Sequence, residues 1–180
     1  MYVHDEFDVT GDVARHLIAS QFPQLVSDRV TFLDRGMDNA VFRAGDVVFR
    51  FPVRKVAAEI LQTEIDVMPR IAAQLNVAVS APHYVGAPTD SYPFTFAGFP
   101  YIAGVAASDC NLSDAQRALL TMPVAQFLRK LHALDQHELA VSERIPPDTI
   151  GRLNHSIRYP LVASRISRLG GFIDPGDASL

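Results

Sequence analysis

The sequence has a single cysteine, Cys110, in 180 residues. One cysteine excludes a disulfide within the chain and a cysteine-rich metal site, and it is compatible with a reducing compartment. An excess of basic charge is also missing, because 16 Lys and Arg stand against 20 Asp and Glu, for a net charge of −4. We therefore expect neither nucleic acid nor an anionic membrane as the main partner of this chain.

Long apolar segments are missing as well. No apolar run approaches the roughly 18 residues that would suggest a membrane-spanning helix. The acidic N-terminus, MYVHDEFDVTGD, lacks the basic-then-apolar order of a signal peptide. A hydrophobic content of 48% is enough for a core and argues against disorder. We expect a soluble cytoplasmic protein of one domain, or of one domain with part of a second.

Two short apolar strands joined by a tight turn form the most informative part of the sequence. Alternation and turn residues predict strands over residues 40–44 and 47–52. Arg50 then shares one face of the second strand with Val48, and the opposite face carries Val47, Phe49 and Phe51. Because an unpaired buried charge is costly, an arginine on so apolar a strand requires an anionic partner.

The following helix offers that partner. Apolar spacing predicts a helix over residues 54–75, with a core-facing stripe formed by Leu61, Met68, Ala72 and Leu75. Glu64 lies in the middle of this stripe, where a carboxylate calls for a cation. We expect Arg50 and Glu64 to form an ion pair. The alternative is that Arg50 extends from an edge strand to solvent and that Glu64 is an ordinary surface residue.

The remaining elements follow from periodicity and turn residues. A helix over 8–22 has Thr10 or Asp8 as its cap, and Ser113 caps a later helix. Pro123 should kink or restart that later helix, and a break is expected at Tyr159-Pro160 in the last one. The full expectation is a loop at 34–39, helices at 8–22, 113–134 and 149–169, and strands at 29–33, 80–86 and 93–101.

Several of these residues together resemble the aminoglycoside/macrolide phosphotransferase family of kinase-like enzymes. The resemblance rests on Gly36-Met37-Asp38-Asn39-Ala40-Val41-Phe42-Arg43, Val48-Phe49-Arg50-Phe51-Pro52, Glu64 and Leu131-His132. It implies an α+β fold: a protein-kinase-like small lobe, with a five-stranded antiparallel sheet and one long helix, followed by the first helices of the large lobe. The lobes would be residues 1–104 and 105–180, with a hinge at 100–104.

The same resemblance implies a site for ATP or GTP. Arg50 would hold the nucleotide phosphates and Glu64 would hold Arg50. The Pro100 carbonyl and the Ile102 amide would read the adenine, between walls at Val41 and Val48. With the Gly36–Asn39 loop, the predicted nucleotide-binding residues are Gly36, Asp38, Asn39, Val41, Val48, Arg50, Glu64, Pro100 and Ile102. The acceptor would be a small-molecule hydroxyl, as in aminoglycoside or macrolide antibiotics, and the complete enzyme would use Mg²⁺.

The catalytic segment of that family, His-Gly-Asp, is missing from this chain. Residues 155–160 and 173–177 are either degraded versions of the catalytic and metal segments or, as we prefer, part of the helical insert before the catalytic loop. We therefore expect a truncated chain without catalytic or metal residues, inactive alone. The alternatives are a non-catalytic kinase-like binding module and an α+β domain without a nucleotide site. Exposed apolar residues over 120–134 or 157–166 would allow self-association.

Overall fold

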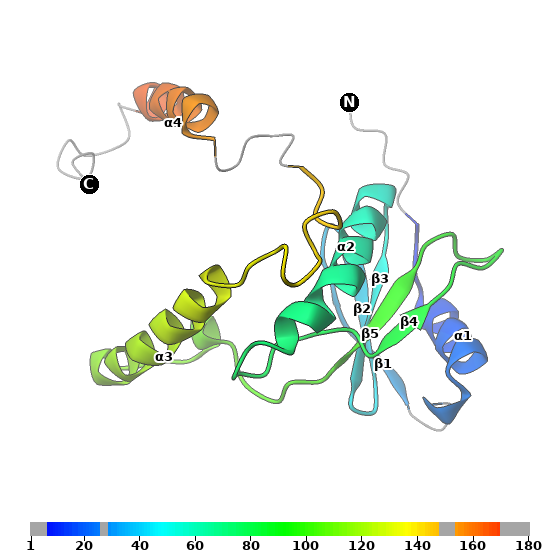
Figure 1. The fold of residues 1–180 in the computed structure, drawn as a ribbon. Helices are drawn as coiled ribbons and strands as arrows, with labels where there is room; N and C mark the ends of the chain where they lie inside the picture. The colour runs from blue at the N-terminus through cyan, green and yellow to red at the C-terminus, as the bar shows by residue number, and fades with distance from the viewer. Residues whose placement is uncertain (1–6, 26–28, 148–153, 170–180) are drawn as a thin grey trace. The chain divides into compact units, whose positions relative to one another are not determined.

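A computed structural model of the chain describes residues 7–25, 29–147 and 154–169. The chain divides into two compact units, residues 1–145 and 146–180. The first unit contains a β-sheet with helices, and the described part of the second is the helix α4, His155–Leu169 (Figure 1). Among the described residues, no helix is long and apolar enough to span a bilayer.

The sheet of the first unit has five antiparallel strands in the order β1-β2-β3-β5-β4. Their bounds are β1 Val30–Arg35, β2 Asn39–Ala44, β3 Val47–Pro52, β4 Tyr84–Gly86 and β5 Phe96–Pro100. The tight β2–β3 turn has Gly45 at φ 56°, a left-handed conformation that glycine adopts without steric cost. Together with the long helix α2, Lys55–Ala72, this sheet confirms the predicted α+β architecture.

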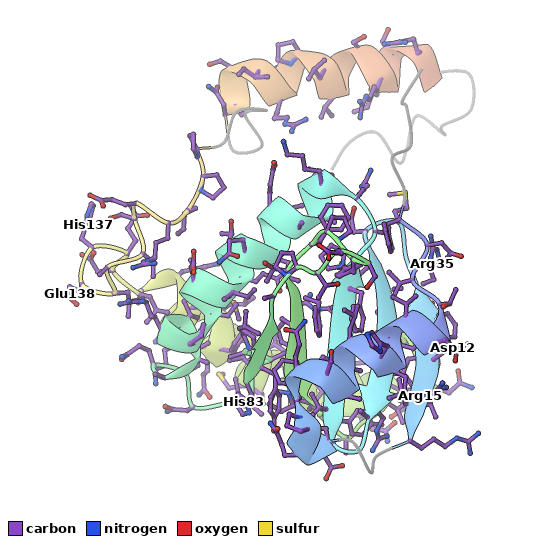
Figure 2. The ribbon with its side chains drawn as sticks, turned by 90° about the vertical axis from the view of Figure 1, so that its right-hand side faces the viewer. Asp12, Arg15, Arg35, His83, His137 and Glu138 are labelled. Atoms are coloured by element: carbon purple, nitrogen blue, oxygen red, sulfur yellow. The ribbon has the colours of Figure 1, made fainter. Side chains whose placement is uncertain are left out.

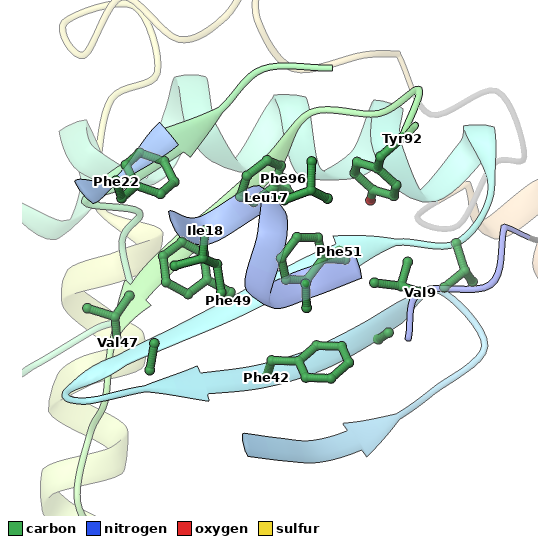
Figure 3. Packing of buried hydrophobic residues seen from close by; sticks show 14 residues of the cluster. Val9, Leu17, Ile18, Phe22, Phe42, Val47, Phe49, Phe51, Tyr92 and Phe96 are labelled. Atoms are coloured by element: carbon green, nitrogen blue, oxygen red, sulfur yellow. The ribbon is translucent and has the colours of Figure 1, made fainter. Parts of the chain in front are cut away.

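The helix α1, Gly11–Gln21, covers one face of the sheet. Its cap is Thr10, whose hydroxyl accepts a hydrogen bond of 3.3 Å from the Val13 amide. Apolar side chains of α1 and of the residue after it pack on the aromatic rows of β2, β3 and β5, and the cluster includes Leu17, Ile18, Phe22, Phe42, Phe49, Phe51 and Phe96 (Figure 3). The ring of Phe51 stacks on that of Phe96 with centroids 4.7 Å apart.

Close approach in this core depends on Gly98 and on a buried tyrosine. A Cβ at Gly98 would lie 2.7 Å from the Phe49 ring, so only glycine lets that ring lie against β5. Tyr92 is fully buried, and its hydroxyl donates a 2.7 Å hydrogen bond to the Pro52 carbonyl. Burial raises the pKa of the Tyr92 hydroxyl, so the neutral donor form is favoured.

The helix α2 covers the other face. Leu61 of α2 packs with Ala97 and Phe99 of β5. Because side chains alternate along a strand, this is the face that also carries Val48 and Arg50, while Val47, Phe49 and Phe51 lie in the α1 core.

The helix α3, Asp114–His132, begins with a capping box between Ser113 and Gln116 and has no buried residue. Two hydrogen bonds link the later part of the unit to α2 and the segment after it: Lys130 Nζ to Asn76 at 2.6 Å, and Arg70 to the Leu139 carbonyl at 3.2 Å. Short 3-10 helices occur at Pro23–Leu25 and Ala107–Asp109. The apolar side chains exposed on α3 include Leu119, Leu120, Met122, Val124 and Leu128.

Several predicted boundaries were wrong. β1 contains a bulge between Phe32 and Asp34 and ends at Arg35, so its last two residues lie inside the loop predicted at 34–39. β4 and β5 are shorter than expected: both begin after a proline, Pro82 and Pro93, which has no N–H to donate to a strand ladder. β4 was expected over 80–86 and β5 over 93–101. The helix expected over 54–75 is α2, Lys55–Ala72.

The helix restart expected as one possibility at Pro123 and the break expected at Tyr159-Pro160 do not occur. α3 continues through Pro123 and α4 through Pro160. A proline removes one backbone donor, and the remaining helical bonds on both sides keep the element continuous. Residues 149–153 of the predicted last helix lie outside the described residues.

Candidate functional site

A cleft of about 350 Å³ opens on the α2 side of the sheet. Strand β3, helix α2, the segment between α2 and β4, strand β5 and the segment after β5 supply its walls. The lining residues are Val48, Arg50, Glu64, Ser80, Phe99, Pro100, Tyr101 and Ile102. The cleft therefore combines an apolar strand surface with one cation and one carboxylate. A volume of this size is at the lower end of ligand pockets in proteins.

Arg50 and Glu64 form the predicted ion pair. The guanidinium contacts both carboxylate oxygens: Nη2 donates to Oε2, and Nη1 lies 3.5 Å from Oε1. The side chains are 28% and 33% exposed, so the pair is only partly screened by solvent. Glu64 lies one turn after Leu61 on the helix face that meets the sheet, which is why its carboxylate reaches the strand.

The ring of Phe99 packs against the same guanidinium. The Arg50 guanidinium carbon lies 3.9 Å from the Phe99 ring centroid, a cation–π geometry. Phe99 is adjacent because the β3–β5 register pairs it with Val48 and pairs Ala97 with Arg50. A guanidinium has five N–H donors, and Glu64 takes only part of them. The remaining donors can bind an oxyanion in the cleft.

The end of β5 is fixed by the β2–β3 turn. The Tyr101 amide donates a 2.8 Å hydrogen bond to the Asp46 carbonyl. Arg43 lies over the Tyr101 ring at 3.7 Å and donates from Nε to the Gly45 carbonyl at 2.7 Å. The amide of Ile102 makes no backbone hydrogen bond within the described part of the chain, and Ile102 lines the cleft.

The predicted site residues fall into two groups. Val48, Arg50, Glu64, Pro100 and Ile102 are brought together in the cleft. The others lie on the loop between β1 and β2 or on β2, and are Gly36, Asp38, Asn39 and Val41. Val41 pairs with Arg50 in the sheet, on the same face, without lining the cleft.

The β1–β2 loop is closed by a 3.0 Å hydrogen bond from the Gly36 amide to the Asn39 carbonyl. A Cβ at Gly36 would meet no atom within 4 Å, so the space around that position is open. The Asp38 carboxylate is held by Arg54, with Nε at 2.8 Å from Oδ1. Asn39 Oδ1 is buried without a hydrogen-bond partner among the described residues.

Sequence reasoning missed three contributors to this region. The sequence analysis assigned no role to the side chains of Phe99, Tyr101 and Arg54. Their contacts with Arg50, Arg43 and Asp38 join residues far apart in the chain. The one available signal was alternation in β5, which places Phe99 and Tyr101 on the face of Ala97.

The cleft does not fit Mg²⁺. Its one carboxylate, Glu64, is already paired with Arg50, whereas Mg²⁺ requires an octahedral set of oxygen ligands. No cluster of three or more His, Cys, Asp or Glu within the described ranges could hold a metal ion. Figure 2 shows His83 and His137 on separate parts of the first unit. Residues 155–160 form the start of α4, and residues 173–177 lie outside the described residues.

Comparison with known proteins gives the family. A family model described as the phosphotransferase enzyme family matches residues 29–166. The chain belongs to this family. No curated protein sequence matches it.

Solved structures of this family share the fold. The GDP and kanamycin complex of APH(2")-IIIa matches with a TM-score of 0.68 and 25% identity, over 91% of this chain and 54% of that one. The streptomycin–ATP–APH(2")-IIa ternary complex matches with a TM-score of 0.58 and 17% identity, over 92% and 53%. The apoenzyme of a macrolide 2'-phosphotransferase from Brachybacterium faecium matches at 0.52 and 22%, over 72% and 46%. This chain thus spans about half the length of these structures.

The Arg50–Glu64 pair should show a measurable coupling free energy. We expect a double-mutant cycle of Arg50→Ala and Glu64→Ala in urea unfolding to give about 1 kcal/mol, because the pair is partly buried and charge-assisted. The exposed Asp12–Arg15 pair on α1 is the matched control, and its cycle should give no measurable coupling. Equal coupling in both cycles would contradict a special role for the partly buried pair.

Proposed function

We propose that this chain is the nucleotide-binding half of an ATP- or GTP-dependent phosphotransferase that acts on a small-molecule hydroxyl. The observation that carries the proposal is the Arg50–Glu64 pair in the cleft beside Pro100–Ile102. A nucleotide has an anionic end and a flat, hydrogen-bonding end. The cleft offers a cation to the first and a free amide at Ile102 to the second.

The same-face arrangement of Val48, Phe99 and Arg50 supports this orientation. The base would lie on Val48 and against the segment 100–102, and the phosphates would extend along β3 to the Arg50 guanidinium. Val41 and the Gly36–Asn39 loop lie next along the same sheet face. The structures of relatives in complex with GDP and with ATP are consistent with either nucleotide.

In this proposal the residues of the chain bind and orient. Phosphoryl transfer depends mostly on positioning and on stabilising charge that develops in the transition state. Arg50 supplies one positive charge to the phosphates, and Glu64 keeps its guanidinium in one orientation. The acceptor base and Mg²⁺ ligands of a complete enzyme are not among the described residues of the cleft. We therefore propose that the chain alone transfers no phosphate.

The acceptor class rests on the relatives. Solved structures of relatives are named for complexes with kanamycin, streptomycin and gentamicin, or for a macrolide 2'-phosphotransferase. We propose an aminoglycoside-like or macrolide-like hydroxyl as the acceptor, and a role in antibiotic resistance in the cytoplasm. The lobes would meet at the proposed hinge, residues 100–104, with the small lobe at 1–104 and the partial large lobe at 105–180.

A second candidate function is a kinase-like module that binds a nucleotide without chemistry. The observation that favours it is the single carboxylate of the cleft, which is already committed to Arg50. Both candidates require nucleotide binding, and turnover separates them.

Nucleotide binding by the 180-residue chain is the first test. We expect Arg50→Ala to weaken ATP or GTP binding roughly tenfold or more in calorimetry, since a charge-assisted phosphate contact is lost. Adenosine and guanosine, which carry no phosphate, should bind Arg50→Ala as they bind the unmodified chain. Arg15→Ala removes an equal charge on α1 and should change neither affinity. Equal losses for nucleoside and nucleotide would contradict the assigned role of Arg50.

Turnover is the second test. The chain, incubated with labelled ATP or GTP, Mg²⁺, and a panel of aminoglycosides and macrolides, should transfer no phosphate above the blank. A full-length family enzyme in the same assay provides the positive control. Mg²⁺-dependent transfer by the short chain would refute the inactivity proposal. Attention would then move to Asp174 and Asp177, outside the described residues, as metal ligands.

We also propose self-association through exposed helix faces. Leu120, Val124 and Leu128 follow one face of α3 at four-residue spacing and are 46%, 53% and 41% exposed. In the second unit, Ile157 and Ile166 of α4 are about half exposed. Sedimentation velocity should show concentration-dependent association that Leu120→Lys with Val124→Lys abolishes. Ala118→Lys, on another face of α3, is the control. A strictly monomeric unmodified chain would contradict this proposal.

A further inference from the structure

The short connection between β3 and α2 is held by three separate segments of the first unit. The Pro52 carbonyl accepts a hydrogen bond from the Tyr92 hydroxyl at 2.7 Å. The Val53 carbonyl accepts from the Phe7 amide at 2.6 Å, and the Val53 amide donates to the Asp38 carbonyl at 2.9 Å. Val53 itself is 1% exposed. This connection is therefore a fixed point between the strand with Arg50 and the helix with Glu64.

Asp38 and Arg54 add a side-chain tie at the same place. Two nitrogens of the Arg54 guanidinium, Nε and Nη2, donate to one oxygen of the Asp38 carboxylate, with Nε at 2.8 Å. Arg54 occupies the N-cap position of α2, yet its side chain makes no capping hydrogen bond. Its side chain is used to hold the loop before β2 and not to close its own helix.

The β1–β2 loop has few other restraints on its tip. Its internal hydrogen bond joins the Gly36 amide to the Asn39 carbonyl at 3.0 Å, and the space around Gly36 is open. Asp38 is thus held twice by consecutive residues, through its carbonyl by Val53 and through its carboxylate by Arg54. These two bonds set where the loop stands relative to the first turn of α2.

The Asp38–Arg54 ion pair is suited to positioning the loop more than to stabilising the folded chain. Its side chains are 36% and 40% exposed, so solvent and salt screen much of their attraction. Glu64 follows ten residues after Arg54 on the same helix, roughly 15 Å along a rigid axis. A displacement of the loop relative to Arg54 therefore changes its distance to the Arg50–Glu64 pair.

We propose that Asp38 and Arg54 are a positioning pair for the phosphates of the bound nucleotide: they fix the β1–β2 loop to the start of α2, so that loop amides and Arg50 reach the same phosphates. This inference rests on the proposed function, because it takes the nucleotide as the ligand of the cleft. The sequence predicted Asp38 as a nucleotide-binding residue; in this proposal its carboxylate is taken up by Arg54, and the pair acts through the loop without contacting the phosphates.

Two readouts test the pair. Asp38→Ala and Arg54→Ala should each weaken triphosphate binding roughly tenfold while nucleoside binding stays unchanged, since the base site is separate. The amides of Gly36 and Val53 should exchange with solvent faster in both variants, measured by NMR without nucleotide. The swapped chain, Asp38→Arg with Arg54→Asp, should recover most of the affinity and the slow exchange. Arg15→Ala is the control and should leave both readouts unchanged.

The outcomes distinguish this inference from the proposed function. Unchanged triphosphate affinity and unchanged exchange in the single variants would overturn the positioning pair, and so would equal losses for nucleoside and triphosphate. An unmodified chain that binds no nucleotide would refute the proposed function and, with it, the phosphate ligand. The exchange measurement then still decides whether the pair holds the loop: faster exchange in the single variants supports the tie, and unchanged exchange overturns it.

Discussion

The charge of Arg50 is the constraint on which the cleft depends. A guanidinium on a strand between apolar neighbours has lost much of its water, and this loss must be offset by partners of the right geometry. Glu64 supplies the opposite charge from α2, and the Phe99 ring supplies an electron-rich face from β5. The contact with Glu64 fixes α2 relative to the sheet, and the contact with Phe99 fixes β5 relative to β3. The core on the other face of the sheet, built from α1 and the aromatic rows, makes the strand rigid enough to carry this pair.

The family places this arrangement in a chemical setting. Enzymes that transfer phosphoryl groups bind polyanions with side chains whose positions are fixed before the ligand arrives. An arginine that is already paired with a carboxylate meets that requirement. In this chain Glu64 holds the cation in one orientation. Because arginine presents a planar fork of donors, it can contact the carboxylate and a phosphate along different edges at the same time. Lysine in this position would offer a point charge without that division of contacts.

The elements that could be predicted from the sequence are those with a strong local pattern. Alternation gave the β2–β3 hairpin, and the ion pair followed because Arg50 and Glu64 both interrupt apolar stripes. The cation–π contact with Phe99 and the Asp38–Arg54 tie could not be predicted, because they depend on strand register and on a loop whose path no local periodicity specifies. For proline the local pattern was misleading. The low helix propensity of proline predicted a break at Pro160, but the helical hydrogen bonds on either side maintain the helix. The nucleotide-contact roles of the predicted residues remain predictions.

The tie between the β2–β3 turn and Tyr101 has a mechanical consequence. The Tyr101 amide is bonded to Asp46, and its ring is covered by Arg43, so Tyr101 belongs to the sheet even though β5 ends at Pro100. Flexing of the chain between the sheet and α3 must therefore pivot beyond Tyr101. The first residue free to turn is Ile102, and Gly104, around which a Cβ would meet no atom within 4 Å, gives the pivot room. The position of the Ile102 amide is thus set by its tied neighbour Tyr101, even though that amide makes no backbone hydrogen bond of its own within the described residues.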